Sequence, residues 1–174
     1  MKRVTLVLGA AASLFCMIVY VAAASGQVAA GGSPLFVDKI PSGYRDWMLI
    51  SVAREEGKLD DIRAVLGNGK ATAAFRGGKL PFPEGTGIAR LAWSLESSEE
   101  NDKAFGRHQS FAAGHPKNGI QFMIKDSKKY AATGGWGFGQ FDDGEPADRT
   151  VLETCFPCHQ AGSSRDLVFT RYAP

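Results

Sequence analysis

Two cysteines and a histidine near the carboxyl end constrain this chain more than any other feature. Residues 155–159 read Cys-Phe-Pro-Cys-His, and the only other cysteine among the 174 residues is Cys16. A disulfide between Cys155 and Cys158 would close too short a loop to be a useful staple for a domain. One helical turn can bring the two thiols to the same side, so we expect them to serve chemistry.

Cys-x-x-Cys-His is the sequence to which a c-type haem is attached. The two thiols add to the vinyl groups on one edge of the porphyrin, and the histidine that follows them binds the iron. We therefore predict one covalently attached haem c, held by Cys155 and Cys158, with His159 as the iron ligand. A thioredoxin-like dithiol normally follows the first strand of a β-α-β unit. A zinc site would need two more ligands, for which only His108 and His115 remain.

The first 24 residues are typical of a secretory signal peptide. Lys2 and Arg3 precede an uncharged run, 4–24, that ends in three alanines, the small residues that a signal peptidase recognises. An uncleaved membrane anchor is the alternative, because the run is nearly long enough to span a bilayer. Export to the periplasm agrees with haem attachment, which takes place outside the cytoplasm. Without these residues the 20 Lys and Arg fall to 18, equal to the 18 Asp and Glu. This balance gives no reason to expect a nucleic-acid partner.

The remaining residues are expected to form one domain. Residues 25–34 (SGQVAAGGSP) are small and predict a flexible leader. Residues 35–174 contain no long linker, repeat or low-complexity tract. Hydrophobic residues make up 44% of the chain and charged residues 22%, which are values of a globular protein.

The spacing of apolar residues predicts an α+β fold with a mainly antiparallel β-sheet. N-terminal helices are expected at 44–56 and 59–66, with a further helical turn at 71–75. Alternation predicts strands at 86–95, 109–113, 120–125 and 134–141, separated by turns at 114–116, 126–127 and 142–144. Glycines alternate with Trp136 and Phe138 in the last strand, where they allow another group to approach the backbone closely. A short C-terminal helix within 146–158 is expected to carry the haem motif, followed by an extended segment at 167–172.

The order of several motifs resembles that of the cytochrome P-460 and cytochrome c′-beta family. The resemblance covers nearly all of 35–174 and rests on YRDW at 44–47, FPEGT at 82–86, GGWGF at 134–138, CFPCH at 155–159 and DLVFT at 166–170. It implies a mostly antiparallel β fold, often found as a homodimer, with one c-type haem bound near the carboxyl end.

This family divides by function. Cytochromes P-460 have a lysine cross-linked to the porphyrin and oxidise hydroxylamine, whereas cytochromes c′-beta lack the cross-link and bind NO and CO in an apolar pocket shaped by phenylalanines. The resemblance places Arg90 nearest to the cross-linking position, and arginine stays protonated and is no nucleophile. The candidates to line the apolar pocket are Phe75, Phe82, Phe105 and Phe111. Arg90 is a candidate to donate a hydrogen bond above the haem or to pair with a propionate, as are Arg165 and Asp166 for a propionate.

Three functions stay open at this point. The leading one is an exported mono-haem cytochrome whose five-coordinate iron binds NO or CO and exchanges electrons with a redox partner protein. The second is an enzyme that oxidises hydroxylamine, for which the candidate bases are Glu153, Asp142 and Asp143. The third is a six-coordinate electron-transfer cytochrome, whose sixth ligand would come from Met48, Met123, His108 or His115.

Overall fold

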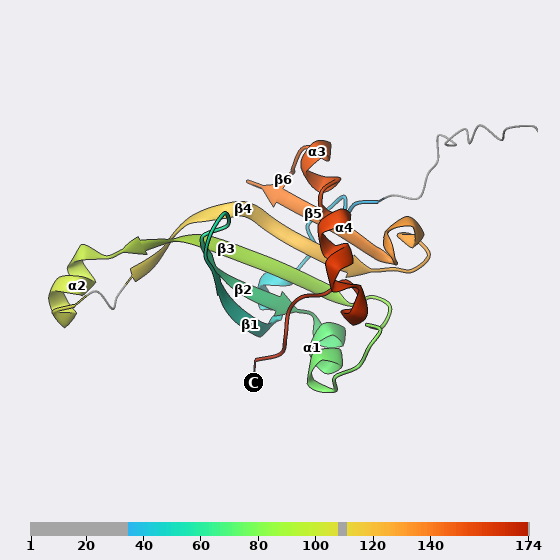
Figure 1. Cartoon of the computed structure of the whole chain (residues 1–174), viewed down its shortest axis with the longest axis horizontal. Helices are drawn as coiled ribbons and strands as arrows, with labels where there is room; N and C mark the ends of the chain where they lie inside the picture. The colour runs from blue at the N-terminus through green and yellow to red at the C-terminus, as the bar shows by residue number, and fades with distance from the viewer. Residues whose placement is uncertain (1–34, 108–110, 174) are drawn as a thin grey trace, which may run out of the picture. The chain divides into compact units, whose positions relative to one another are not determined.

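A six-stranded antiparallel sheet forms the centre of the protein, with its strands in sequence order from β1 to β6 (Figure 1). The computed structural model describes residues 35–107 and 111–173, so the predicted signal peptide (1–24) and leader (25–34) lie outside the described residues. The strands are Met48–Glu55 (β1), Asp61–Gly67 (β2), Gly87–Ser97 (β3), Phe111–Lys125 (β4), Trp136–Asp142 (β5) and Glu145–Pro146 (β6). The α+β class and the antiparallel meander are confirmed.

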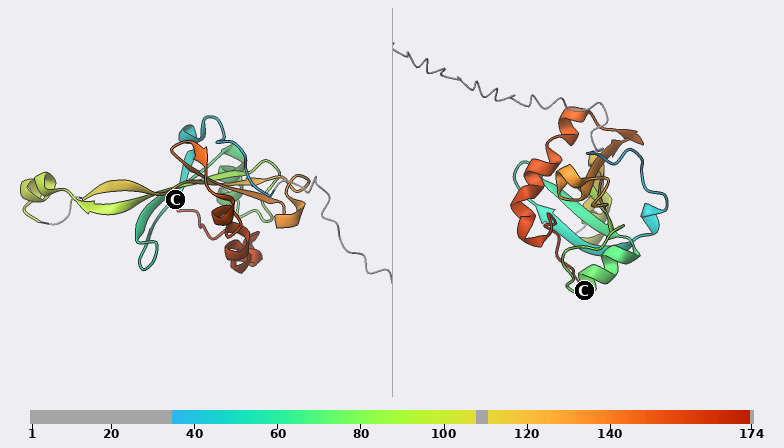
Figure 2. Two further views of the ribbon diagram at one scale, coloured as in Figure 1. Left: turned by 90° about the horizontal axis from the view of Figure 1, so that it is seen from above. Right: turned by 90° about the vertical axis from the view of Figure 1, so that its right-hand side faces the viewer.

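Short helices connect and follow the strands. They are η1 (Tyr44–Asp46), α1 (Gly69–Arg76), α2 (Glu99–Phe105), η2 (Ala131–Thr133), α3 (Arg149–Leu152), α4 (Cys155–His159) and η3 (Gln160–Arg165). Figure 2 shows α3 and α4 on one face of the sheet. The segment 35–47, which contains η1 and is called the N-terminal segment below, lies on the other face. Within 35–107 and 111–173, none of the helices is long and apolar enough to cross a membrane.

Alternation along the strands gives each face of the sheet its own apolar cluster. Ile88, Met123 and Phe138 are neighbours across β3, β4 and β5 and belong to the cluster beneath α4. Leu91 and Phe122 belong to the second cluster, which the N-terminal segment covers with Val37 and Tyr44. We call the face beneath α4 the motif face and the other the opposite face.

The helices predicted at 44–56 and 59–66 are wrong. Only 44–46 is helical there, and β1 pairs with β2 from Met48 opposite Gly67 to Glu55 opposite Asp61. A register shift between Leu49 and Ser51 interrupts the alternation, and Ile50 is buried while Leu49 is exposed. An edge strand with such a bulge does not show a clean period of two, so its apolar residues imitate helical spacing.

Residues 111–113 and 120–125, predicted as parts of two strands, belong to one strand, β4, and the turn predicted at 114–116 is wrong. Residues 109 and 110 of the first predicted strand lie outside the described residues. Pro116 lies opposite Trp93, where the register of β3 and β4 shifts. A proline within a strand is tolerated at such an irregularity because no regular ladder hydrogen bond is lost. The predicted turns at 126–127 and 142–144 are confirmed.

The remaining helical predictions hold in part. The helical turn predicted at 71–75 lies within α1. The region predicted as one helix at 146–158 contains two, α3 and α4, with a turn between them. Residues 167–172 form no strand, and Asp166 and Leu167 have left-handed backbone angles, with φ of 53° and 67°.

The glycines of β5 are confirmed as positions of close approach. A Cβ atom added at Gly137 would lie 2.3 Å from the ring of Tyr130, and one added at Gly139 would lie 2.9 Å from the side chain of Val37.

Gly137→Ala should therefore lower the free energy of unfolding by about 1–3 kcal/mol through overpacking. Denaturant titration measures the change. Gly69→Ala is the control, because nothing lies within 4 Å of its added Cβ. Equal losses in the two variants would contradict the prediction.

Candidate functional site

The haem motif forms α4, a helix of a single turn on the motif face (Figure 1). Pro157 fits there because the first turn of a helix does not need its backbone N–H. Cys155 is half-buried and Cys158 is exposed, and neither forms a disulfide. Burial raises the pKa of the Cys155 thiol, which keeps this group protonated at neutral pH. The thiols are thus available for another use.

Cys155, Cys158 and His159 border a cavity of about 470 Å³ between α4, the sheet and the C-terminal segment. This volume falls in the usual range of small-molecule sites, about 300–1,000 Å³. The sheet contributes apolar side chains to the cavity from four strands: Val65, Ile88, Met123 and Phe138. It also contributes polar ones: Glu55, Arg63, Arg90, Asn118 and Gln121. A large group with an apolar body and a polar edge fits such a lining.

The ring of His159 is fixed from three directions. The ring centroids of Phe138 and Phe169 lie 5.0 and 5.2 Å from that of His159. Its Nδ1 lies 2.7 Å from the backbone oxygen of Leu167. A carbonyl oxygen can only accept, so Nδ1 carries the proton and Nε2 keeps the lone pair that binds a metal. Burial lowers the pKa of His159, which favours this neutral, ligating form.

A fully buried carboxylate organises the two arginines of the cavity. Asp61 of β2 forms ion pairs with Nε of Arg63, at 3.0 Å, and with Nη2 of Arg90. Arg63 also pairs with Glu55 at the end of β1. Burial lowers the pKa of the Arg90 guanidinium, and the charge of Asp61 acts in the other direction. This cluster contains two carboxylates, Glu55 and Asp61, and two guanidiniums, so it carries no net charge, although Asp61 lies behind the lining and does not itself border the cavity.

These ion pairs begin a row of hydrogen-bonded polar side chains, here called the polar row, that continues across the sheet. Nη1 of Arg90 donates to Oε1 of Gln121 at 3.1 Å, and Nε2 of Gln121 donates to Oε1 of Gln140 at 2.8 Å. Gln140 then donates to Asp142 at 3.4 Å. One hydrogen-bonded row therefore joins β1 to β5. Sequence reasoning had singled out only Arg90 and Asp142 of this row, and not as partners, because the row joins strands that lie far apart in the chain.

The structure brings the four predicted cofactor-binding residues to one cavity. Cys155, Cys158, His159 and Arg90 all border it, although the sheet and α4 supply them separately. Asp166, predicted to hold a propionate, does not border the cavity and instead pairs with Lys125 at 2.7 Å. The propionate role proposed for Asp166 is therefore not supported by its position.

The predicted phenylalanine lining is wrong for Phe75, Phe82 and Phe105, which do not border the cavity. Phe75 and Phe82 pack in the core of the motif face, and Phe105 on α2 is 64% exposed. The side chain of Phe111 lies outside the described residues. The phenylalanines that border the cavity are Phe122, Phe138 and Phe169. Phe75 and Phe105 lie on α1 and α2, and Phe82 lies in the loop before β3, so none of the three belongs to the strands that line the cavity.

Among the predicted sixth ligands, Met123 borders the cavity. Met48 and His115 are exposed and do not border it, and His108 lies outside the described residues. The predicted bases Glu153, Asp142 and Asp143 do not border it either. Glu55 is the carboxylic acid among the described lining residues, and sequence reasoning missed it by placing this residue in a helix.

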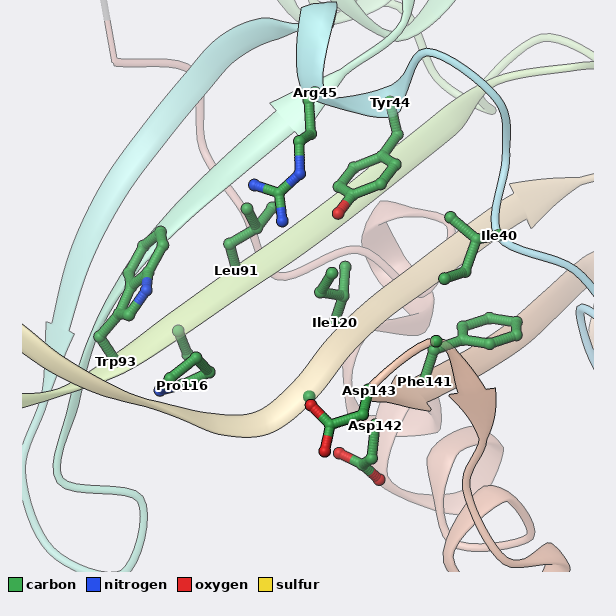
Figure 3. Close-up of a pocket in the computed structure, with 13 residues that line it drawn as sticks. Ile40, Tyr44, Arg45, Leu91, Trp93, Pro116, Ile120, Phe141, Asp142 and Asp143 are labelled. Carbon is green, nitrogen blue, oxygen red and sulfur yellow. The ribbon is translucent and has the colours of Figure 1, made fainter.

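A second cavity, of about 560 Å³, lies on the opposite face of the sheet (Figure 3). Its lining includes Tyr44, Arg45, Trp93, Phe141, Asp142 and Asp143, but none of the haem-motif residues. Within 35–107 and 111–173, no group of three or more His, Cys, Asp or Glu could hold a metal ion. The antiparallel sheet also lacks the β-α-β unit of a thioredoxin-like site. The cavity of the motif face is therefore the candidate cofactor site.

Asp61 offers a direct test of the polar row. Asp61→Asn removes the charge that two half-buried guanidiniums share, so the free energy of unfolding should fall by about 3–5 kcal/mol. Denaturant titration of the purified protein measures this loss. The control is Glu153→Gln, which breaks the exposed ion pair with Arg149 and should cost less than about 1 kcal/mol. An Asp61→Asn variant as stable as this control would show that the ion pairs of Asp61 contribute little to the free energy of unfolding.

The comparisons with known proteins agree with this geometry. The model of one family, described as Cytochrome P460, matches residues 41–170, a range that contains the whole sheet, α4 and the residues that border the cavity. No curated protein matches the chain. Since the family match covers well over half of the residues, this chain belongs to the cytochrome P460 family and is a haem protein.

Proposed function

We propose that this chain is an exported c-type cytochrome that holds one haem through Cys155 and Cys158 and binds its iron through His159. The hydrogen bond from Nδ1 of His159 to Leu167 carries the proposal, because it leaves Nε2 as the ligating nitrogen. Both thiols border the same cavity as this ring. When bound, the haem supplies an iron that can take up a small ligand or an electron.

The position opposite His159 is proposed to be open. Met123 is the cross-strand neighbour of Phe138, and the ring of Phe138 packs against His159. In the proposed arrangement, this neighbourhood puts Met123 beside the histidine, which argues against its use as a ligand opposite His159. An iron with one free position binds diatomic ligands such as NO and CO, the ligands proposed here.

The polar row gives such a ligand hydrogen-bond donors. Arg63, Arg90 and Gln121 border the cavity, and Asp61 and Glu55 balance the arginine charges. A neutral polar lining suits an uncharged ligand, because it donates hydrogen bonds without a net charge that would attract anions. In the proposed role, these residues orient the ligand by donating hydrogen bonds, and no proton is transferred from the guanidinium groups to the ligand.

Oxidation of hydroxylamine is the second candidate function, and Glu55 is the observation that favours it. Its carboxylate borders the cavity, where it could accept a proton from a substrate. Against it, no lysine is among the described residues that line the cavity, so the lining offers no amine for a cross-link to the porphyrin. We therefore rank ligand binding first.

The site of action is also proposed. The uncharged run at 4–24 supports export to the periplasm, where covalent haem attachment takes place. The proposed partners are a small diatomic or nitrogen-oxide ligand, a redox partner protein and a second copy of this chain.

Covalent attachment is testable without any assay of function. Haem should stay with the protein after extraction with acidified acetone, because thioether bonds survive unfolding. The double variant Cys155→Ala with Cys158→Ala should release its haem under the same treatment, as absorbance of the extract will show. Release from the wild-type protein would contradict the proposed attachment.

The open position is tested by the ferrous spectrum. The ferrous wild-type protein should be high-spin and should shift on addition of CO, because the iron has a free position. Met123→Leu keeps the volume of the side chain and should leave both spectra unchanged. A low-spin wild-type spectrum that becomes high-spin in Met123→Leu would identify Met123 as a sixth ligand and contradict the proposal.

A further inference from the structure

Lys125, at the end of β4, is a buried cation that lies outside the cavity lining. It is only 6% exposed, and it does not line the cavity. Its Nζ lies 2.7 Å from Oδ1 of Asp166, 3.3 Å from the backbone oxygen of Gly134 and 5.0 Å from the ring centroid of Trp136. Lysine is almost never buried without a partner, and a buried ion pair rarely adds stability over apolar packing. Its presence here points to a task other than stability.

Asp166 uses its second carboxylate oxygen to fix the chain. Oδ2 accepts a hydrogen bond from the backbone N–H of Phe82 at 2.9 Å. The backbone of Asp166 and of Leu167 is left-handed, with φ of 53° and 67°. Two successive left-handed residues that are not glycine are unfavourable, and such a conformation persists only where surrounding contacts hold it. Lys125 and the N–H of Phe82 are the contacts that hold Asp166.

This left-handed segment ends at the carbonyl that fixes His159. The backbone oxygen of Leu167 lies 2.7 Å from Nδ1 of His159. The Leu167 side chain is buried in the core of the motif face. The backbone N–H of Leu167 donates to the backbone oxygen of Gly162 at 3.0 Å. The direction of the carbonyl therefore depends on the backbone angles that Asp166 stabilises. A continuous set of contacts runs from Lys125 through Asp166 and Leu167 to His159.

We propose that Lys125 and Asp166 are positioning residues for His159: their ion pair holds the Leu167 carbonyl against Nδ1 and so sets the orientation and basicity of the imidazole. This inference rests on the proposed function, in which Nε2 of His159 binds the haem iron. A hydrogen bond from the outer ring nitrogen makes a metal-bound imidazole more basic. A more basic imidazole strengthens the iron–histidine bond and favours ferric over ferrous iron.

A purely structural role is the competing explanation, because the ion pair also ties together the ends of β4 and η3 and the loop before β3. Removing one partner cannot separate the two roles, since it leaves a buried charge without compensation. Lys125→Met together with Asp166→Ala removes both charges at once. This double variant should keep the fold while it frees the backbone at Asp166–Leu167.

The experiment compares the haem-loaded wild-type and double-variant proteins by resonance Raman spectroscopy and by redox titration. The iron–histidine stretching frequency of the ferrous double variant should fall, and its reduction potential should rise, because the imidazole loses its hydrogen-bond acceptor. Glu153→Gln is the matched control, since it removes an exposed ion pair of the same C-terminal region. It should leave both values at those of the wild-type protein.

Each outcome decides the proposal. A folded double variant with a wild-type frequency and potential would show that the ion pair does not position His159. A double variant that fails to fold, beside a normal control, would show that the pair serves the fold instead. A wild-type protein with no iron–histidine band would contradict the proposed function rather than this inference. The two failures are thus distinguishable.

Discussion

The proton on Nδ1 of His159 is held by the carbonyl of Leu167, and this single hydrogen bond decides which ring nitrogen can bind a metal. The bond depends on two segments that the sheet brings together. α4 carries the histidine, and the left-handed residues Asp166 and Leu167 carry the acceptor. Burial adds to the effect, because it keeps the imidazole neutral. The chemistry of the haem motif thus depends on backbone outside the motif.

The sheet gives the cavity two kinds of surface. On the motif face its apolar residues pack beneath α4, while a row of paired charges and amides crosses the same face from Glu55 to Gln140. Asp61 is central to that row because it is fully buried and pairs with both Arg63 and Arg90. A haem protein with such a lining can combine an apolar pocket with fixed hydrogen-bond donors.

Sequence reasoning succeeded where the signal is local. The five consecutive residues of the motif predicted a haem protein, which the family match supports, and short alternating runs predicted β3 and β5. β1 was misread as a helix because a bulge breaks its alternation. The segment at 59–66 was misread as a helix because two acidic residues near its start, Asp60 and Asp61, are typical of the first turn of a helix. The polar row could not be predicted, because it joins residues that only the sheet register brings together. The Lys125–Asp166 pair could not be predicted either, because it joins the end of β4 to the residue that follows η3, 41 residues away.

A crystal structure of the haem-loaded protein tests the central claim most directly. The account predicts haem density in the cavity of the motif face, continuous with the sulfur atoms of Cys155 and Cys158. It also predicts a bond from the iron to Nε2 of His159, with Nδ1 still hydrogen-bonded to Leu167. Haem in the cavity of the opposite face, or iron bound by a residue other than His159, would contradict it.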